Sequence, residues 1–122
     1  MVRAFRGAIT AESNTEAEIL EKTGILYDEI VRKNSLCADD FVCIFFSLTP
    51  GLDKVFPARA VREKGICDVP LMCFAEIPVE GALKNCIRIM ILSESDKSRA
   101  EIRHIYMGGA TALRPDIAGK ED

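Results

Sequence analysis

A single charged residue interrupts a strongly apolar stretch of the sequence. Residues 86–92 read CIRIMIL, and in a strand the side chain of Arg88 shares its face with apolar side chains only. A guanidinium in this setting is costly unless it is paired. Arg88 is therefore expected to form an ion pair with an acid such as Glu76 or Glu80, to lie on an exposed edge, or to hold an anionic ligand with its rigid fork.

Three further residues are candidates for the same site. Arg6 shares a face of the first expected strand with small apolar residues, although a first strand is often an edge, where an exposed arginine means little. Glu76 lies near the end of its strand and can pair with an arginine or accept a hydrogen bond from a ligand hydroxyl. Tyr106 fits equally well as a packed aromatic whose hydroxyl reaches the surface. His104 shares the alternation of Tyr106 and is left out, because a single strand histidine is more often structural.

The sequence contains no recognisable set of catalytic or metal-binding residues. The five cysteines, at positions 37, 43, 67, 73 and 86, include no C-x-x-C pair, and one histidine is available to join them. This pattern indicates neither a zinc site nor a disulfide framework. No phosphate-binding glycine loop and no Ser/His/Asp or Cys/His set is visible. Several arginines and one glutamate in apolar settings indicate a binder of a small dianion, without specifying a reaction.

The apolar periodicity predicts an α+β, or mixed α/β, fold with one long and one short helix. The expected strands span residues 2–8, 41–48, 69–77, 86–92 and 102–107. The long helix is capped by Asn14 or Thr15 and continues to Val31, and the short helix covers residues 55–64 with Pro57 in its first turn. The run 41–48 is almost continuously apolar, which predicts a central strand covered on both faces.

We expect one domain over residues 1–116 and a flexible tail over 117–122. Five strands covered mainly by one helix leave a second sheet face open, and a symmetric oligomer would cover it. The formal charge of −3, without a clustered basic stripe, argues against nucleic acid as a partner. No apolar stretch approaches the roughly 20 residues that span a bilayer, and no signal peptide is recognisable, so a cytoplasmic protein without a membrane partner is expected.

Four stretches together resemble the AroH-class, monofunctional trimeric chorismate mutases. They are RAFRGA at 3–8 with TEAEIL at 15–20, VFPARAVR at 55–62, VPLMC at 69–73, and CIR at 86–88 followed by IRHIY at 102–106 and LRPD at 113–116. The resemblance implies a mixed sheet with helices on one side, and three chains assembled into a pseudo-barrel with active sites at the subunit interfaces. It also implies the rearrangement of chorismate to prephenate in the biosynthesis of tyrosine and phenylalanine, without cofactor, metal or covalent intermediate.

The resemblance also implies a catalytic set. Arg88 faces the ether oxygen and one carboxylate of chorismate, and Arg6, with Tyr106, holds the enolpyruvyl carboxylate. Glu76 and the region of Cys73 contact the ring hydroxyl. The rearrangement gathers negative charge on the ether oxygen and needs neither a base nor a nucleophile, so a cation and a shape-selecting cage suffice.

Further residues are implied as the wall and entrance of the site. The apolar wall is formed by Phe56, Leu71, Met72 and Phe74. Near the ring carboxylate or the entrance lie Arg62 and Arg114, with Leu113 beside them. Arg59 stands where the family pattern has lysine and is treated as peripheral. Met72 stands where the pattern has threonine, so only backbone contacts are expected there.

Two other functions compete with this interpretation. One is a trimeric imine deaminase of the RidA type, which also places an arginine at a subunit interface to hold a carboxylate. The other is a non-catalytic trimer that binds a small carboxylate as a regulatory signal. Turnover of chorismate would separate both from a mutase.

Overall fold

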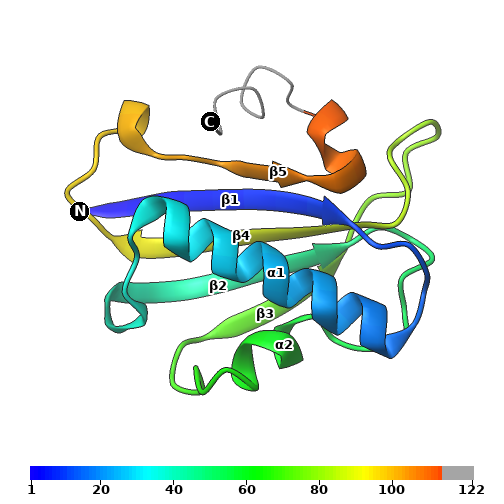
Figure 1. Cartoon of the computed structure of the whole chain (residues 1–122), viewed down its shortest axis with the longest axis horizontal. Coiled ribbons are helices and arrows are strands. Elements are labelled where there is room, and N and C mark those ends of the chain that lie inside the picture. The colour runs from blue at the N-terminus through cyan, green and yellow to red at the C-terminus, as the bar shows by residue number, and fades with distance from the viewer. Residues whose placement is uncertain (114–122) are drawn as a thin grey trace.

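The computed structural model describes residues 1–113, and Figure 1 shows the order of their elements. The strands are β1 (Val2–Thr10), β2 (Phe41–Leu48), β3 (Leu71–Ala75), β4 (Cys86–Glu94) and β5 (Ile105–Met107). The helices are α1 (Glu16–Asn34) and α2 (Ala58–Arg62), with 3₁₀ turns η1 (Ala38–Asp40), η2 (Arg99–Glu101) and η3 (Gly108–Ala112). The predicted fold class, with five strands and one long and one short helix, is confirmed.

The strands form one mixed sheet in the order β3-β2-β4-β1-β5. β4 pairs antiparallel with both β1 and β2, and the outer pairs β1–β5 and β2–β3 are parallel. Although a first strand is often an edge, this one is not, because β5 returns from the far end of the chain to pair outside β1. Arg6 therefore lies on an interior strand, where its side chain points to one face of the sheet.

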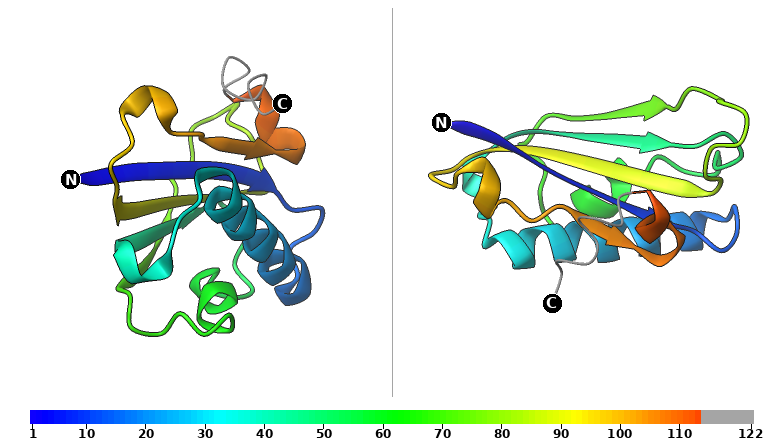
Figure 2. Two further views of the ribbon diagram at one scale, coloured as in Figure 1. Left: turned by 60° about the vertical axis from the view of Figure 1, so that its left-hand side comes forward. Right: turned by 90° about the horizontal axis from the view of Figure 1, so that it is seen from above.

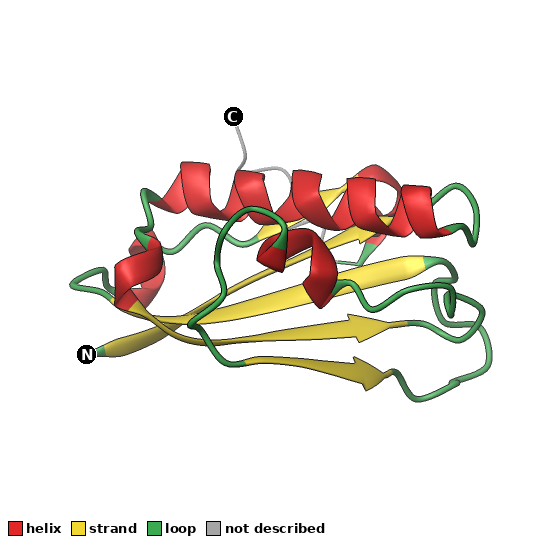
Figure 3. Cartoon of the chain, turned by 90° about the horizontal axis from the view of Figure 1, so that it is seen from below, coloured by secondary structure: helices red, strands yellow, loops and turns green. Residues whose placement is uncertain are grey.

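Both α-helices cover the same face of the sheet, and within residues 1–113 no α-helix lies over the opposite face (Figures 2 and 3). The main core lies under the helices, where Phe5, Leu26, Ile44, Phe46 and Ile89 are almost fully buried. β2 is an interior strand as predicted, but coverage on both faces is wrong for the single chain. Ile44 and Phe46 are buried, whereas the alternate residues Cys43, Phe45 and Ser47 are partly exposed. We call this second side the open face.

The long helix begins and packs as its sequence indicates. Thr15 is the N-cap, and its hydroxyl accepts a hydrogen bond from the Glu18 backbone N–H at 3.2 Å. The helix packs directly on β1 at Gly7, where a Cβ would lie 2.6 Å from the Ile105 carbonyl oxygen and 2.9 Å from a methyl of Leu26. Glycine is therefore needed at this point of closest approach between helix and sheet.

Several elements are shorter than predicted. α2 covers only residues 58–62, because the residue before Pro57 is disfavoured in helical geometry and the proline itself is the N-cap. β3 ends at Ala75, where β2 also ends, although the Glu76 N–H still donates to the Leu48 carbonyl at 2.9 Å. No helix within residues 1–113 is long and apolar enough to cross a membrane.

Candidate active site

The open face carries a groove of about 370 Å³ between β1, β2, β4 and β5. Strand register places its polar residues on one side of the sheet, because directly paired residues share a face. Ala8 on β1 pairs with Arg88 on β4 and with Tyr106 on β5. Arg6, two residues before Ala8, faces the same way. The three predicted residues Arg6, Arg88 and Tyr106 therefore line one groove.

Arg88 forms an ion pair with Glu76 across β2. Its Nε donates to the two carboxylate oxygens of Glu76 at 3.0 and 3.2 Å, so Glu76 rather than Glu80 is its partner. Ser47 donates from its hydroxyl to the Glu76 Oε2 at 2.6 Å. Within residues 1–113, Arg88 uses only Nε for hydrogen bonds, which leaves the terminal nitrogens of its fork available to a ligand.

Arg6 is held by its backbone rather than by its side chain. The Arg6 N–H donates to Nδ1 of His104 at 3.3 Å. The Nε of Arg6 is buried and has no hydrogen-bonding partner among the described residues. A buried donor without a partner is unusual and costs free energy unless a ligand or water satisfies it. The arrangement favours an anion in the groove beside Tyr106, which is itself buried.

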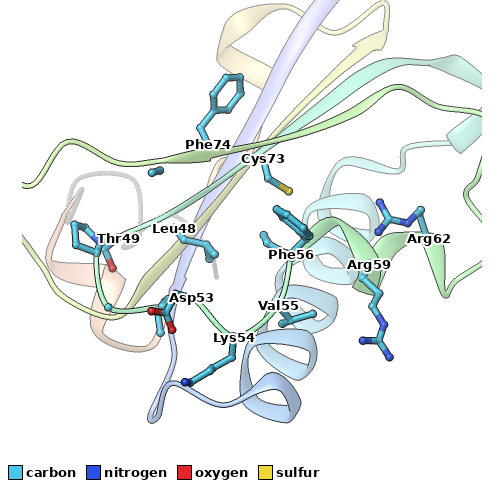
Figure 4. A pocket seen from close by; sticks show the side chains of 15 residues that line it. Leu48, Thr49, Asp53, Lys54, Val55, Phe56, Arg59, Arg62, Cys73 and Phe74 are labelled. Carbon is cyan, nitrogen blue, oxygen red and sulfur yellow. The ribbon is translucent and has the colours of Figure 1, made fainter.

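A second and larger cavity, of about 690 Å³, lies on the other side of β3, next to α2. Its lining includes the predicted residues Phe56, Arg62 and Cys73 (Figure 4). In Figure 4, Cys73 points toward Phe56, whereas the ring of Phe74 points away on the opposite side of the strand. Phe74 contributes to both cavities because β3 is the wall between them.

The predicted site residues therefore fall into two groups separated by the sheet edge. The open-face group contains Arg6, Glu76, Arg88 and Tyr106, and Phe74 lines both cavities. The α2 group contains Phe56, Arg62 and Cys73. Within the single described chain, neither cavity contains both groups.

Comparison with known proteins relates the whole sequence to one enzyme family. A family model described as chorismate mutase type I matches residues 2–117. The chain belongs to this family. It is 44% identical over 119 residues to the chorismate mutase AroH of Bacillus subtilis, covering 97% of this chain and 94% of that protein. It is 36% identical over 118 residues to the chorismate mutase AroH of Thermus thermophilus, covering 96% and 97%.

A solved structure gives the same result for the fold. A chorismate mutase from Clostridium thermocellum superposes with a TM-score of 0.89 at 43% identity, covering 91% of this chain and 99% of that chain. The predicted enzyme class and the resemblance to AroH-class chorismate mutases are therefore confirmed. The comparisons favour a chorismate mutase over the imine deaminase and the regulatory trimer.

The thiols of Cys73 and Cys86 in this chorismate mutase are arranged for packing or hydrogen bonding rather than for nucleophilic attack. Burial raises the pKa of the Cys73 thiol, and the Ala58 backbone and the Arg62 charge offset only part of that effect. Burial also raises the pKa of the Cys86 thiol to about 11. Both groups therefore remain protonated near neutral pH. Such a thiol can donate a weak hydrogen bond to a substrate hydroxyl.

The remaining predicted residues lie around the two groups. Arg59 pairs with Glu63 at 3.1 Å and with Glu16 at 3.2 Å on the surface, and these acids raise the pKa of its guanidinium. Leu113 packs on the small buried cluster that contains Tyr106. Leu71 and Met72 line neither of the two cavities in the single chain. Arg114 lies outside the described residues.

Sequence reasoning missed two residues that touch the site. His104 was set aside as structural, yet its ring nitrogen accepts the backbone N–H of Arg6. Ser47 carries no signal of its own in the apolar run 41–48. Its alternation with Phe45 could have placed it on a partly exposed face, but its contact with Glu76 depends on the pairing of β2 with β3.

Proposed function

We propose that this chorismate mutase rearranges chorismate to prephenate at a site completed by two neighbouring subunits of a homotrimer. The observation that carries the proposal is the division of the site residues between two cavities on opposite sides of β3. The product feeds the biosynthesis of tyrosine and phenylalanine. The reaction fits the available groups because it needs charge and shape, and neither a base nor a nucleophile.

Arg88 is the proposed electrostatic catalyst. In the rearrangement the ether C–O bond breaks ahead of C–C bond formation, and negative charge gathers on the ether oxygen. A cation that is already fixed at this point stabilises the transition state without reorganisation. The Glu76 carboxylate fixes Nε of Arg88, which leaves its terminal nitrogens to contact the ether oxygen and one carboxylate. An acceleration of about 10⁶ corresponds to about 8 kcal/mol, which cation placement and conformational restriction can supply together.

The other groups hold the substrate. Arg6 and Tyr106 bind the enolpyruvyl carboxylate, which would give the buried Nε of Arg6 a partner. Glu76 and Cys73 contact the ring hydroxyl. The proposed apolar wall comprises Phe56, Leu71, Met72 and Phe74. The proposed entrance comprises Arg62, Leu113 and Arg114.

Exposed apolar side chains on both sides of β3 support assembly. On the open face Met72 is 56% exposed and Phe74 is 48% exposed, and beside α2 Phe56 is 71% exposed. Large exposed apolar side chains next to ligand cavities are typical of interfaces. A cyclic trimer would bring the α2 group of one chain against the open-face group of the next. When the ring closes, each of the three α2 groups meets one open-face group.

A cytoplasmic location is also proposed. All five cysteines are free, including Cys37 and Cys67 on the surface. Free surface thiols are typical of the reducing cytosol, whereas extracellular proteins usually pair them.

Replacement of Arg88 tests the proposed chemistry. We expect Arg88→Ala to lower kcat by at least 10³-fold with a much smaller change in KM, because its charge acts mainly in the transition state. Arg88→Lys should lose most of the activity too, since a compact ammonium cannot reach ether oxygen and carboxylate together. The measurement is the loss of chorismate absorbance together with detection of prephenate. An Arg88→Ala enzyme with near-normal kcat would refute the assignment.

A further inference from the structure

Ser47 lies between the two partners of the Arg88–Glu76 ion pair, on the strand that separates them. On β2 it pairs with Arg88 of β4 on one side and with Phe74 of β3 on the other. Glu76 follows the end of β3, so its carboxylate reaches across β2 to meet Arg88 two strands away. Neighbouring strands are about 4.8 Å apart, which makes this span about 10 Å. The side chain at position 47 therefore lies beneath the ion pair.

The Ser47 hydroxyl contacts the carboxylate directly. It donates to Oε2 of Glu76 at 2.6 Å, the same oxygen that accepts from Arg88 Nε at 3.0 Å. A carboxylate accepts and does not donate, so the direction of this bond is fixed. Charge-assisted hydrogen bonds of this kind are short and strong. The Ser47 hydroxyl on β2 and the Arg88 Nε on β4 thus both donate to the Glu76 carboxylate.

The environment of Ser47 distinguishes this contact from an ordinary core hydrogen bond. Ser47 is only partly buried and lines the open-face groove beside Arg88. Among residues 1–113, its hydroxyl bonds to a side chain and to no backbone group. Ser93, on β4, is the opposite case, because its hydroxyl donates to the backbone carbonyls of Asp40 and Glu94. Removal of the Ser47 hydroxyl should therefore disturb the ion pair more than the fold.

We propose that Ser47 is a positioning residue, which fixes the Glu76 carboxylate and through it the plane of the Arg88 guanidinium. The proposal rests on the proposed role of Arg88. Without the hydroxyl, Glu76 can rotate about its side-chain bonds, and the fork of Arg88 loses its orientation toward the groove. Small misplacements of a catalytic group are expensive in rate because the reacting geometry is narrow.

Four variants test this role by activity. Ser47→Ala removes the hydroxyl, and Ser47→Thr and Ser47→Val form a pair of matched shape with and without it. We expect Ser47→Ala and Ser47→Val to lower kcat by about 10-fold or more, with KM changed less than threefold. Ser47→Thr should keep kcat within about threefold of the wild type. The control Ser93→Ala should leave kcat unchanged, and thermal unfolding of each variant measures any effect on the fold.

A double-mutant cycle adds a stricter criterion. If Ser47 acts through Glu76, Ser47→Ala should change kcat little in a Glu76→Gln background, where the carboxylate is already absent. Equal losses for the threonine and valine variants would overturn the proposal in favour of a purely steric role. Wild-type kcat in Ser47→Ala, or independent additive losses in the cycle, would also overturn it.

A measurement without turnover separates this inference from the proposed function. Nitrogen-15 NMR of arginine-labelled protein follows exchange of the Arg88 Nε–H with solvent, with the signal assigned through Arg88→Lys. We expect slow exchange in the wild type and exchange at least 10-fold faster in Ser47→Ala. Equal exchange in both proteins would overturn the positioning role, whether or not chorismate is consumed. A normal kcat in Arg88→Ala would refute the proposed role of Arg88 in the reaction. If exchange is nevertheless faster in Ser47→Ala, the role of Ser47 in holding the ion pair stands.

Discussion

At the scale of single residues, the protonation state of Cys73 limits what this site can do. Burial raises the pKa of its thiol, so the folded protein keeps the proton at pH values where a free cysteine begins to ionise. We expect kcat to stay constant between about pH 7 and 8, because the arginines remain charged and a thiol whose pKa is raised by burial remains neutral there. Initial rates across this range provide the measurement.

Ionisation of the Cys73 thiol also predicts how the rate would change with pH if the neutral-thiol role were wrong. If the thiolate took part, the rate would rise with pH as its population increased, by up to about tenfold per pH unit below the pKa. Cys73→Ser, which keeps a donor, is the matched control and should retain the flat profile. A rise in the wild type that Cys73→Ser removes would contradict the neutral-thiol role.

Single residues also show where sequence reasoning ends. Strand alternation alone predicted that Arg88 faces one side with apolar residues, and the register confirms it, because Met90 and Leu92 pair with Arg6 and Ala4 on the same face. The choice between Glu76 and Glu80 remained open because it depends on sheet order. Contacts such as Arg6 with His104 join residues 98 positions apart, and no local pattern encodes such pairs.

At the scale of elements, Asn34 connects the end of α1 to the segment that leads into β5. It is buried, and its amide donates to the carbonyls of Ile30 and Arg103 at 2.9 and 2.8 Å. Its side-chain oxygen accepts the Arg103 N–H at 2.8 Å. Asn34 thereby fixes the strand that carries Tyr106, and its polar side chain is satisfied at a buried helix end.

We expect Asn34→Ala to lower the free energy of unfolding by about 2–3 kcal/mol, because it leaves the backbone groups of Arg103 without partners. Thermal and urea unfolding measure this loss. Asn14 is a matched control, because its side chain donates one hydrogen bond to Asp53 and accepts one from it, as that of Asn34 does with Arg103, but in an exposed loop. Asn14→Ala should cost less than about 1 kcal/mol. Similar losses of unfolding free energy in both variants would contradict the role of Asn34 in connecting α1 to the segment before β5.

Elements differ in how much of them the sequence specifies. β4 and α1 were predicted well because their patterns are long and periodic, and the Thr15 cap was one of two options. β5 has three residues, and its place outside β1 depends on the Asn34 contacts and on the absence of a side chain at Gly7. Both are tertiary effects, so the interior position of β1 could not be derived from its own pattern.

At the scale of the whole molecule, mixing two inactive variants tests whether the sites are shared. Arg88→Ala damages the open-face group, and Phe56→Asp with Arg62→Glu damages the α2 group, at exposed positions that should tolerate charge. When both are unfolded and refolded together, about one quarter of the interfaces in a cyclic trimer should contain two intact halves. About one quarter of wild-type activity should therefore return.

Two controls make this result decisive. Each variant refolded alone should stay inactive, and size measurement should show that the mixture contains trimers of both chains. A mixture that co-assembles and remains inactive would place each site within a single chain, contrary to the division seen across β3.

The alternation of side chains along β3 has a genetic consequence. Cys73 lies in β3 and Glu76 directly follows its end, three codons on, yet their side chains serve opposite sides of the sheet edge and, in the proposed trimer, two different active sites. Inactivating alleles at these neighbouring codons should therefore complement each other in a cell that carries both. An in-frame deletion of one codon between them would reverse the direction of every following side chain in the strand. That single lesion would turn Glu76 away from the open face and leave Cys73, which precedes it, in place, so it should behave as an allele of the open-face group alone.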